Sequence, residues 1–318
     1  MNIFVYIQQD KGKINSVSLE ALQGAQEIAK KCNGSVTAIT FNANTSNTLA
    51  SYDLNEIVLI EDPQLEEYNP LFYVKALYDI LNEKQFDIIV FGHTYETRDW
   101  VPRLSARLDI PFISDCINFN SEPKLTFTRS VYQGKLNSEV SSNNDKYIIS
   151  FQSGAFKADQ INLGNSKIQN ISVDLSSVSD IIQSGEKFQE SESSIDLSQA
   201  EIIVSVGRGI GKEENLPIAK QLATVLKAEL ASSRPVVDSG WLEAYHQVGS
   251  SGQNVSPKLY FALGISGAIQ HVVGMKGSKT ILVINKDSDA PIFEIADYGV
   301  IGDIFEIIPI LTEKLNNL

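Results

Sequence analysis

The chain has 318 residues, of which 43% are hydrophobic and 20% charged, so it is long enough for about two domains with ordinary globular cores. Its net charge of −13 argues against nucleic acid as a partner, because neutralising phosphates requires clustered Lys and Arg. No window approaches about 18 apolar residues, and the two cysteines form no CxxC motif, which argues against membrane insertion and a zinc or iron–sulfur centre and predicts a cytoplasmic protein.

The N-terminal half alternates apolar runs of strand type with segments of helical periodicity. The opening run MNIFVYIQQD lacks a basic region and is too short for a signal peptide, so it is interpreted as a first strand. The expected order is strand, helix, strand, strand, helix, strand, helix. These elements are predicted at 2–8, 18–32, 35–41, 56–61, 71–83, 87–92 and 98–108.

After this alternation the pattern changes to short strands, and we expect them to extend the parallel sheet in antiparallel fashion. They are predicted at 124–132, 137–142 and 147–154. Residues 183–200 are polar, acidic and rich in serine, a composition that cannot bury enough apolar surface to fold alone. The sequence therefore predicts an N-terminal α/β scaffold and partner-contact domain at 1–182, a linker at 183–200 and a C-terminal domain at 201–318.

The C-terminal domain begins with a strand at 201–207 that enters a glycine turn, followed by a helix at 216–230. Three further strands and a terminal helix are predicted at 258–266, 280–287, 291–303 and 304–315. Each strand runs into a polar or glycine-bearing end, and ligands of open α/β sheets collect at the carboxyl ends of strands. We therefore expect two Rossmann-like open parallel-sheet α/β domains, with the binding site in the second.

Several polar loops of this domain suit a phosphate-bearing cofactor. GRGIG (207–211) is one residue short of the dinucleotide fingerprint, and a phosphate clamp by Arg208 and a plain tight turn explain it equally well. QVGSSG (247–252) alone is more typical of an ordinary loop. GISGAIQH (264–271) is the most specific signal, because a strand enters a turn and a helix start whose N–H groups form an anion site. It is not a nucleophile elbow, since the second glycine comes one residue early.

The segments GISGAIQH, VDSGW, GMKGSKTILVINKD and APIFEIADYGVIGD resemble the alpha subunit of electron transfer flavoproteins nearly residue for residue. The similarity covers most of 201–308 and extends more weakly over 1–155. It implies one FAD in the C-terminal domain, its isoalloxazine ring facing a beta subunit in a heterodimer. It also implies an electron carrier from flavin dehydrogenases, such as acyl-CoA dehydrogenase, to a membrane quinone oxidoreductase. Such a carrier has no catalytic residues and no metal of its own.

The resemblance also implies a role around FAD for each matching residue. Arg234 would lie over the flavin ring with Ser233 nearby, and His271 would hydrogen-bond the ring carbonyl next to N1. Ser251 would address N5. The carbonyl on the far side would be contacted by the segment of Gln247, Val248, Gly249 and Ser250. The pyrophosphate and ribityl region would be held by Arg208, Ser266, Gly267, Ala268, Ile269 and Gln270. The adenosine end would be held by Asn285 and Asp303, with Ile304 adjoining.

Two departures from the family pattern and two other functions bear on this interpretation. Ser250 stands where many members carry glutamine, and Ser251 stands where many carry threonine, so only the hydroxyl at 251 is kept. One alternative is the alpha subunit of an NADH-oxidising, electron-bifurcating flavoprotein, because the discriminating residues lie largely in the beta subunit. The other alternative is an NAD-binding enzyme built on the same open α/β domain.

Overall fold

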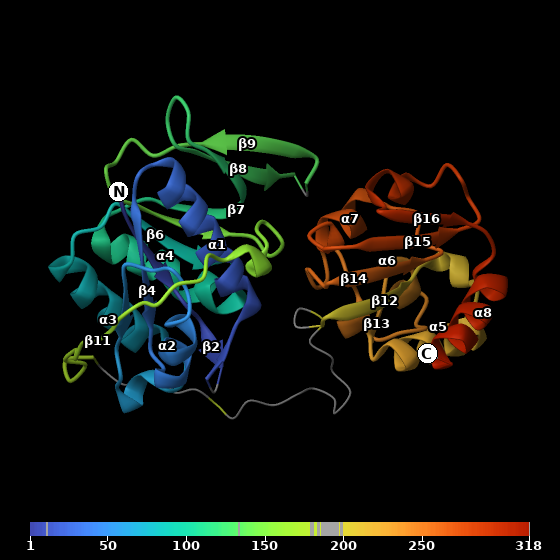
Figure 1. Ribbon diagram of the computed structural model, residues 1–318, viewed down its shortest axis with the longest axis horizontal. Coiled ribbons are helices and arrows are strands. Elements are labelled where there is room, and N and C mark those ends of the chain that lie inside the picture. The colour runs from blue at the N-terminus through green and yellow to red at the C-terminus, as the bar shows by residue number, and fades with distance from the viewer. Residues whose placement is uncertain are drawn as a thin grey trace. The chain divides into compact units, whose positions relative to one another are not determined.

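The computed structural model of the protein describes residues 1–10, 12–132, 134–178, 181–182, 185, 197 and 200–317. Internal contacts divide the chain into two units. They are Met1–Val131 with Leu136–Lys187, and Tyr132–Lys135 with Phe188–Leu318. Each unit is a mainly parallel sheet flanked by helices (Figure 1), so the predicted fold class is confirmed. The linker predicted at 183–200 lies outside the described residues except at 185, 197 and 200.

The first unit contains a nine-stranded sheet with the order β11-β5-β4-β1-β6-β10-β7-β8-β9. Pairing is parallel from β11 through β7 and antiparallel from β7 through β9. The strands are β1 Asn2–Tyr6, β4 Ser35–Thr40, β5 Glu56–Leu59, β6 Ile88–Gly92, β7 Phe112–Asn120, β8 Thr126–Val131, β9 Leu136–Val140, β10 Tyr147–Phe151 and β11 Ile168–Asn170. A separate hairpin joins β2 Gln9–Asp10 to β3 Lys13–Ile14.

Helices cover both faces of this sheet, and they are α1 Ser16–Lys31, α2 Ala43–Leu49, α3 Pro70–Glu83 and α4 Tyr95–Leu108. On one face α1 packs Leu22 and Ile28 against the strands, next to Leu49 of α2. On the other face lie α3 and α4, with the fully buried Trp100 of α4 at the centre of an aromatic cluster. α4 begins earlier than the predicted helix at 98–108, because Thr94 caps it through a capping box.

The strand β10 corrects one expectation, since the segment 147–154 was expected in the antiparallel extension. It lies in the interior of the sheet between β6 and β7 and pairs in parallel with both. All five residues of β10 are buried, and a continuous apolar run is typical of a parallel strand covered on both faces. The antiparallel pairing of β8 with β9 is confirmed. β7, which was not predicted, pairs with β10 on one side and β8 on the other.

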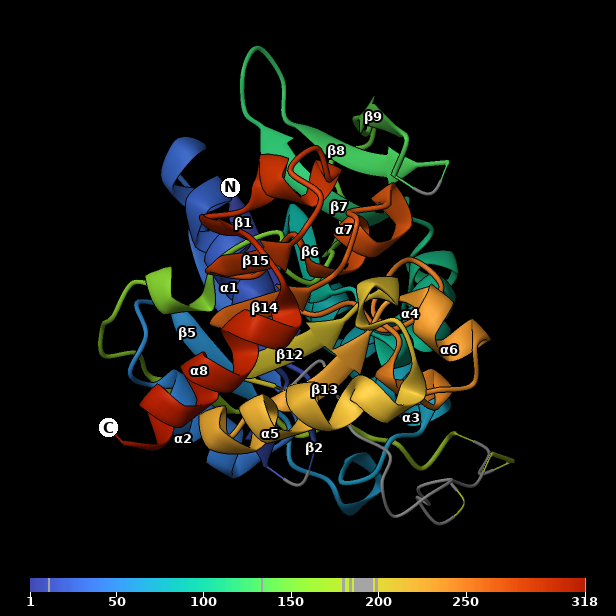
Figure 2. The same cartoon turned by 90° about the vertical axis from the view of Figure 1, so that its right-hand side faces the viewer.

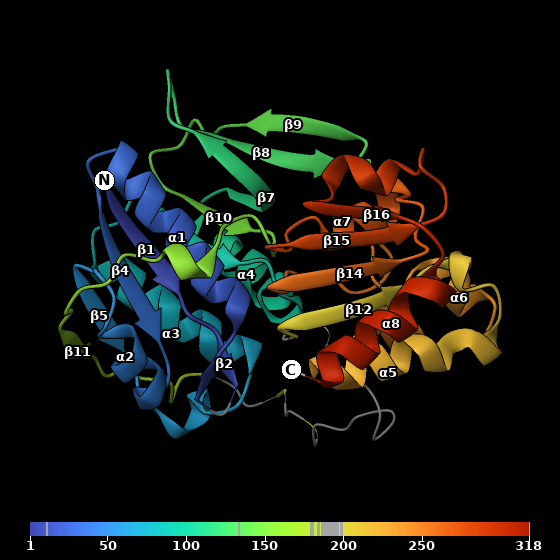
Figure 3. The same cartoon turned by 45° about the vertical axis from the view of Figure 1, so that its right-hand side comes forward.

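The second unit contains a five-stranded, all-parallel sheet with the order β13-β12-β14-β15-β16. Figure 3 shows β12, β14, β15 and β16 of this sheet side by side. Its strands are β12 Ile202–Val206, β13 Glu229–Ser232, β14 Leu259–Leu263, β15 Ile281–Asn285 and β16 Tyr298–Ile301. Its helices are α5 Leu216–Leu226, α6 Arg234–Asp238, α7 Ile269–Met275 and α8 Ile304–Asn316. α5 and α8 lie side by side on one face (Figure 2), and Met275 of α7 packs on the other.

Two segments of the second unit differ from the sequence prediction. The helix predicted at 216–230 ends at Leu226, because Lys227 adopts the left-handed conformation with φ +51° and the chain turns into β13. The strand predicted at 291–303 is divided into a 3-10 helix, Pro291–Ile295, and the shorter β16. Pro291 explains the division, since it fixes φ and has no N–H for a sheet ladder. Within the described parts of the chain, no helix is long and apolar enough to cross a membrane.

Candidate functional site

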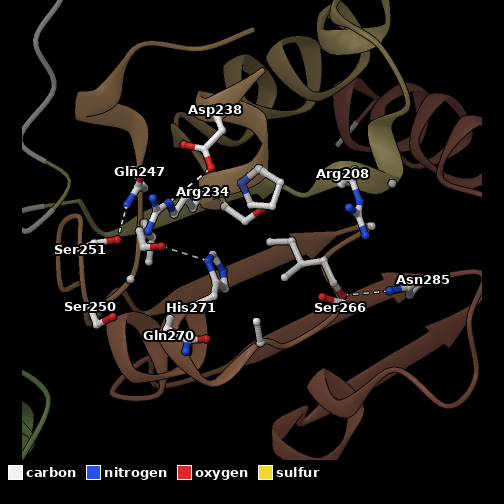
Figure 4. A pocket seen from close by; sticks show the side chains of 18 of the residues that line it. Arg208, Arg234, Asp238, Gln247, Ser250, Ser251, Ser266, Gln270, His271 and Asn285 are labelled. Atoms are coloured by element: carbon white, nitrogen blue, oxygen red, sulfur yellow. Dashed lines mark hydrogen bonds and ion pairs between the residues drawn. The ribbon is translucent and has the colours of Figure 1, made fainter. Parts of the chain in front are cut away.

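A cavity of about 730 Å³ lies at the carboxyl edge of the second sheet (Figure 4). Its walls come from the loops that follow β12, β13, β14 and β15, and from the loop 247–251. Because the strands are parallel, their carboxyl ends meet at this edge, as expected for a ligand site of an open α/β sheet. The volume lies within the range of about 300–1,000 Å³ typical of small-molecule sites.

The structure brings most of the predicted cofactor-binding residues to this cavity. Those that line it are Arg208, Ser233, Arg234, Gln247, Val248, Gly249, Ser250, Ser251, Ser266, Ala268, Gln270, His271 and Asn285. The predicted residues that do not line it are Gly267, Ile269, Asp303 and Ile304. Sequence reasoning missed Asp238 and Asp287, which also line it. Both lie in segments that the sequence analysis had already assigned to the family pattern, VDSGW and INKD. Asp238 follows Arg234 by four residues and Asp287 follows Asn285 by two, so their closeness to predicted site residues could have identified them.

The glycine turns that follow β12 and β14 are packed directly against each other. A Cβ at Gly207 would lie 2.3 Å from the carbonyl oxygen of Gly264, and a Cβ at Gly209 would lie 2.7 Å from its Cα. Gly264 itself has a φ of +60°, and its carbonyl accepts a hydrogen bond from Gly209 N at 3.0 Å. Only glycine permits this approach of two backbones. The turns therefore hold Arg208 and Ser266 on neighbouring loops of the cavity.

A row of backbone N–H groups at 265–270 is available to a ligand. No acceptor in the described part of the chain is bonded to these amides, whereas the next two, of His271 and Val272, both donate to Ala268 O. Asn285 Nδ2 secures the start of the turn by donating to Ile265 O at 2.8 Å. Free amides at the start of a helix suit anionic oxygens, because they are donors at the positive end of aligned peptide dipoles.

Two arginines bring positive charge to the cavity. Arg208 makes no ion pair with any residue that the structure describes. Arg234 begins α6, and its Nε lies 3.3 Å from Asp238 Oδ2. Both partners of this ion pair are more than half exposed, so it stabilises the fold by only about 0.5 kcal/mol. The guanidinium of Arg234 can therefore turn to an anionic ligand at small cost.

The loop that carries Ser250 and Ser251 is held against α7. Ser250 N donates to Gln270 O at 2.8 Å, and the close approach requires glycine at 249, where φ is +142° and a Cβ would lie 2.7 Å from Gln270 O. Gln247 Nε2 donates to Ser251 Oγ at 2.9 Å. Because this oxygen accepts from Gln247, the Ser251 hydroxyl keeps its own hydrogen for an acceptor in the cavity.

His271 is almost fully buried, with 5% of its surface exposed, and both of its ring nitrogens have partners. Nδ1 lies 3.0 Å from Val248 O, and Nε2 lies 2.9 Å from Tyr260 Oη. Burial lowers the pKa of His271 from its ordinary value of 6.5 to about 4, so the ring is neutral at pH 7. The predicted hydrogen bond to a flavin carbonyl needs a ring N–H. A neutral imidazole has a single N–H, and here it lies on Nδ1 and donates to Val248 O.

Asp303 lies outside the cavity and caps α8. Its Oδ1 accepts from Phe305 N at 2.9 Å, and Lys286 Nζ lies 2.8 Å from Oδ2. The pKa of the Asp303 carboxyl is lowered mainly by the hydrogen bond from Lys286 and, to a smaller extent, by that from Phe305 N. A contact between Asp303 and a ribose therefore stays a prediction, and it would compete with Lys286.

Comparison with known proteins identifies the family. Residues 3–176 match the model of the electron transfer flavoprotein domain, and residues 196–276 match that of the electron transfer flavoprotein FAD-binding domain. The electron transfer flavoprotein subunit alpha of Thermoanaerobacterium thermosaccharolyticum is 35% identical, over 100% of this chain and 98% of that protein. This chain belongs to the electron transfer flavoprotein alpha-subunit family.

Two further relatives carry different names. The electron transfer flavoprotein subunit alpha of Bacillus subtilis is 35% identical, over 96% of this chain and 95% of that protein. The lactate dehydrogenase (NAD(+),ferredoxin) subunit LctC of Acetobacterium woodii is 31% identical, over 96% of this chain and 75% of that protein. The family therefore includes both plain electron transfer subunits and a subunit of an NAD- and ferredoxin-linked enzyme.

FAD is the cofactor of the matched C-terminal domain, and the residues present fit it. The amides at 265–270 and the guanidinium of Arg208, which have no partner among the residues that the structure describes, suit a diphosphate. The glycines at 207, 209 and 264 leave room that a Cβ would fill. Ser251 and Arg234 add a hydroxyl donor and a cation at the other side of the cavity, where they suit the polar atoms of a flavin ring (Figure 4).

Proposed function

We propose that this chain carries FAD within a heterodimer with an electron transfer flavoprotein beta subunit. It accepts electrons from flavin dehydrogenases, acyl-CoA dehydrogenases among them, and passes them to a membrane-bound quinone oxidoreductase. The observation that carries the proposal is the cavity at the carboxyl edge of the second sheet, where free amides and two arginines meet in a matched FAD-binding domain. Bound FAD supplies the redox chemistry, and the protein binds and tunes it.

The division of the cavity between the parts of FAD follows from the donors in each region. The amides of 265–270 and the guanidinium of Arg208 would hold the diphosphate. Gly267 and Ile269 do not line the cavity, and they would contribute to binding only through their backbone N–H groups. Asn285 would hold the adenosine end, with Asp303 and Ile304 at the end of the neighbouring strand β16.

The loop 247–251, Ser233, Arg234 and His271 would surround the flavin ring. The positive charge of Arg234 favours the added negative charge of a reduced cofactor and so raises its reduction potential. Within the described residues that line the cavity, no nucleophile is paired with a base: Ser251 is bonded to Gln247, and His271 to Tyr260. This agrees with a carrier that makes and breaks no substrate bonds.

A second candidate function is supported by one of the relatives. The Acetobacterium woodii subunit belongs to an enzyme named for NAD(+) and ferredoxin, and it is 31% identical over 96% of this chain. This similarity favours an NADH-oxidising, electron-bifurcating heterodimer as the alternative. The other alternative, an NAD-binding enzyme, has less support, because the FAD-binding model covers both GRGIG and GISGAIQH.

The proposal is tested by coexpressing the chain with its beta subunit and recording the visible spectrum of the purified complex. We expect a flavin spectrum, one FAD in the second unit, and bleaching by an acyl-CoA dehydrogenase supplied with its substrate. Rapid bleaching by NADH instead would favour the bifurcating alternative. A colourless complex that takes up no added FAD would contradict both.

A further inference from the structure

Tyr260 is the residue from which the further inference starts. It lies in β14, has no exposed surface and belongs to the core on the α7 side of the sheet. A buried tyrosine hydroxyl needs a hydrogen-bond partner, because leaving a polar group unpaired in the core is costly. The Tyr260 hydroxyl has His271 Nε2 as its partner at 2.9 Å. Burial also raises the pKa of Tyr260, so the hydroxyl keeps its proton over the accessible pH range.

The direction of each hydrogen bond on His271 follows from its partners. The carbonyl oxygen of Val248 can only accept, so Nδ1 must carry the ring proton. In the neutral ring Nε2 is then an acceptor, and the Tyr260 hydroxyl must donate to it. The imidazole is thus fixed from two elements, β14 and the loop after Gln247. Four other charged side chains line the cavity, and they are Arg208, Arg234, Asp238 and Asp287. They come from other segments, and none of them hydrogen-bonds to His271.

We propose that Tyr260 is a positioning residue for His271: its hydroxyl fixes the imidazole ring beside the cofactor cavity, with a ring proton on Nδ1. The inference rests on the proposed function, since only a flavin in the cavity gives the orientation of this ring a consequence. A neutral His271 offers no N–H to the cavity while both partners are kept. It gains a donor at Nε2 only by taking up a proton or by exchanging Tyr260 for another partner. Tyr260 thereby controls what His271 presents to the flavin.

The protonation of His271 can be read directly by nitrogen NMR. The chain has three histidines, so labelling the alpha subunit with imidazole-15N histidine gives few signals, and a His271→Gln spectrum assigns the one of interest. In the FAD-loaded heterodimer we expect His271 to be neutral at pH 7, with Nδ1 protonated and Nε2 shifted as a hydrogen-bond acceptor. A spectrum with the proton on Nε2, or with both nitrogens protonated, would overturn the inference without any variant.

Tyr260→Phe removes only the donor, and Tyr298→Phe is the matched control, because it deletes a hydroxyl from the exposed edge strand β16 of the same sheet. In Tyr260→Phe the Nε2 signal should move towards that of an unbonded ring nitrogen. The preference for the present ring orientation should fall about fivefold, since one hydrogen bond stabilises it by roughly 1 kcal/mol. An Nε2 signal that stays in place in Tyr260→Phe would overturn the inference.

The flavin reduction potential supplies the functional readout. We expect it to change in Tyr260→Phe and to stay unchanged in Tyr298→Phe, because only the first variant alters the group beside the cavity. An unchanged potential in Tyr260→Phe would refute control of the flavin by Tyr260. A heterodimer without flavin that shows the expected His271 signals would refute the proposed function and leave the assignment of the Tyr260–His271 contact standing. The two failures are therefore distinguishable.

Discussion

Acidification should destabilise the second unit through His271. The folded state holds this ring neutral, because burial lowers its pKa from 6.5 to about 4. In the unfolded chain the ring is in water and takes up a proton near pH 6.5. Between these two values the unfolded state binds more protons than the folded state, so the stability is full above pH 6.5 and falls as the pH drops towards 4.

The size of this loss follows from the same two values. Each unit of pKa difference corresponds to 1.36 kcal/mol, so a pKa of about 4 against 6.5 gives a total loss of about 3 kcal/mol. Half of it should be reached near pH 5. Such a loss is a large share of the 5–15 kcal/mol by which a domain is ordinarily stable. His246 should add to it, because burial also lowers the pKa of that ring.

The assay is urea unfolding of the flavin-depleted chain from pH 7 to pH 4, followed by tryptophan fluorescence. The chain has two tryptophans, one in each unit, so a Trp100→Phe background leaves Trp241 to report on the second unit alone. His271→Gln is the comparison, because an amide can donate to Val248 O and accept from Tyr260. The free energy of unfolding of His271→Gln should fall less steeply with pH. At pH 4 its loss should be smaller than that of the parent protein by up to about 3 kcal/mol. Parallel profiles for the two proteins would refute the reasoning.

Three further predictions concern single side chains. Gly207→Ala should cost about 1–3 kcal/mol and weaken FAD retention, because its Cβ would lie 2.3 Å from a backbone oxygen. Gly302→Ala, which meets only the end of a side chain, is its control in urea unfolding, and an equal cost would contradict the steric argument. Arg208→Met should raise the FAD dissociation constant about 10- to 100-fold in equilibrium dialysis, with stability unchanged. Trp100→Ala should destabilise the first unit by about 3–5 kcal/mol in denaturant titrations, since the side chain is fully buried.

Local patterns in the sequence were enough to predict most elements. Leu22, Ala25 and Ile28 follow one another at a helical spacing of three residues, and they lie on the buried face of α1. The runs that became β1, β4, β6 and β12 consist mainly of apolar and β-branched residues, which fit a strand covered on both faces. The motifs around GISGAIQH identified the family, and the comparisons confirmed it.

Elements whose conformation depends on distant partners were predicted less well. The helical pattern of α5 continues in the sequence into the first residues of β13, but the helix ends where Lys227 turns the chain. The extended form of β13 comes from pairing with β12. Likewise the position of β10 between β6 and β7 depends on the pairing of residues 35 to 59 positions apart in the sequence, for which a single sequence gives no signal.

The candidate site shows the same division between local and tertiary information. The sequence alone determined that Arg208, Ser266 and Asn285 stand at the carboxyl ends of strands or in the turns after them, because strand and turn preferences are properties of short segments. Only the parallel pairing of β12, β14 and β15 brings these loops to one cavity. Tyr260 resembles any core aromatic until the fold sets its hydroxyl against His271. Which polar groups become neighbours is decided by long-range packing, since a buried donor must find its acceptor wherever the fold places one.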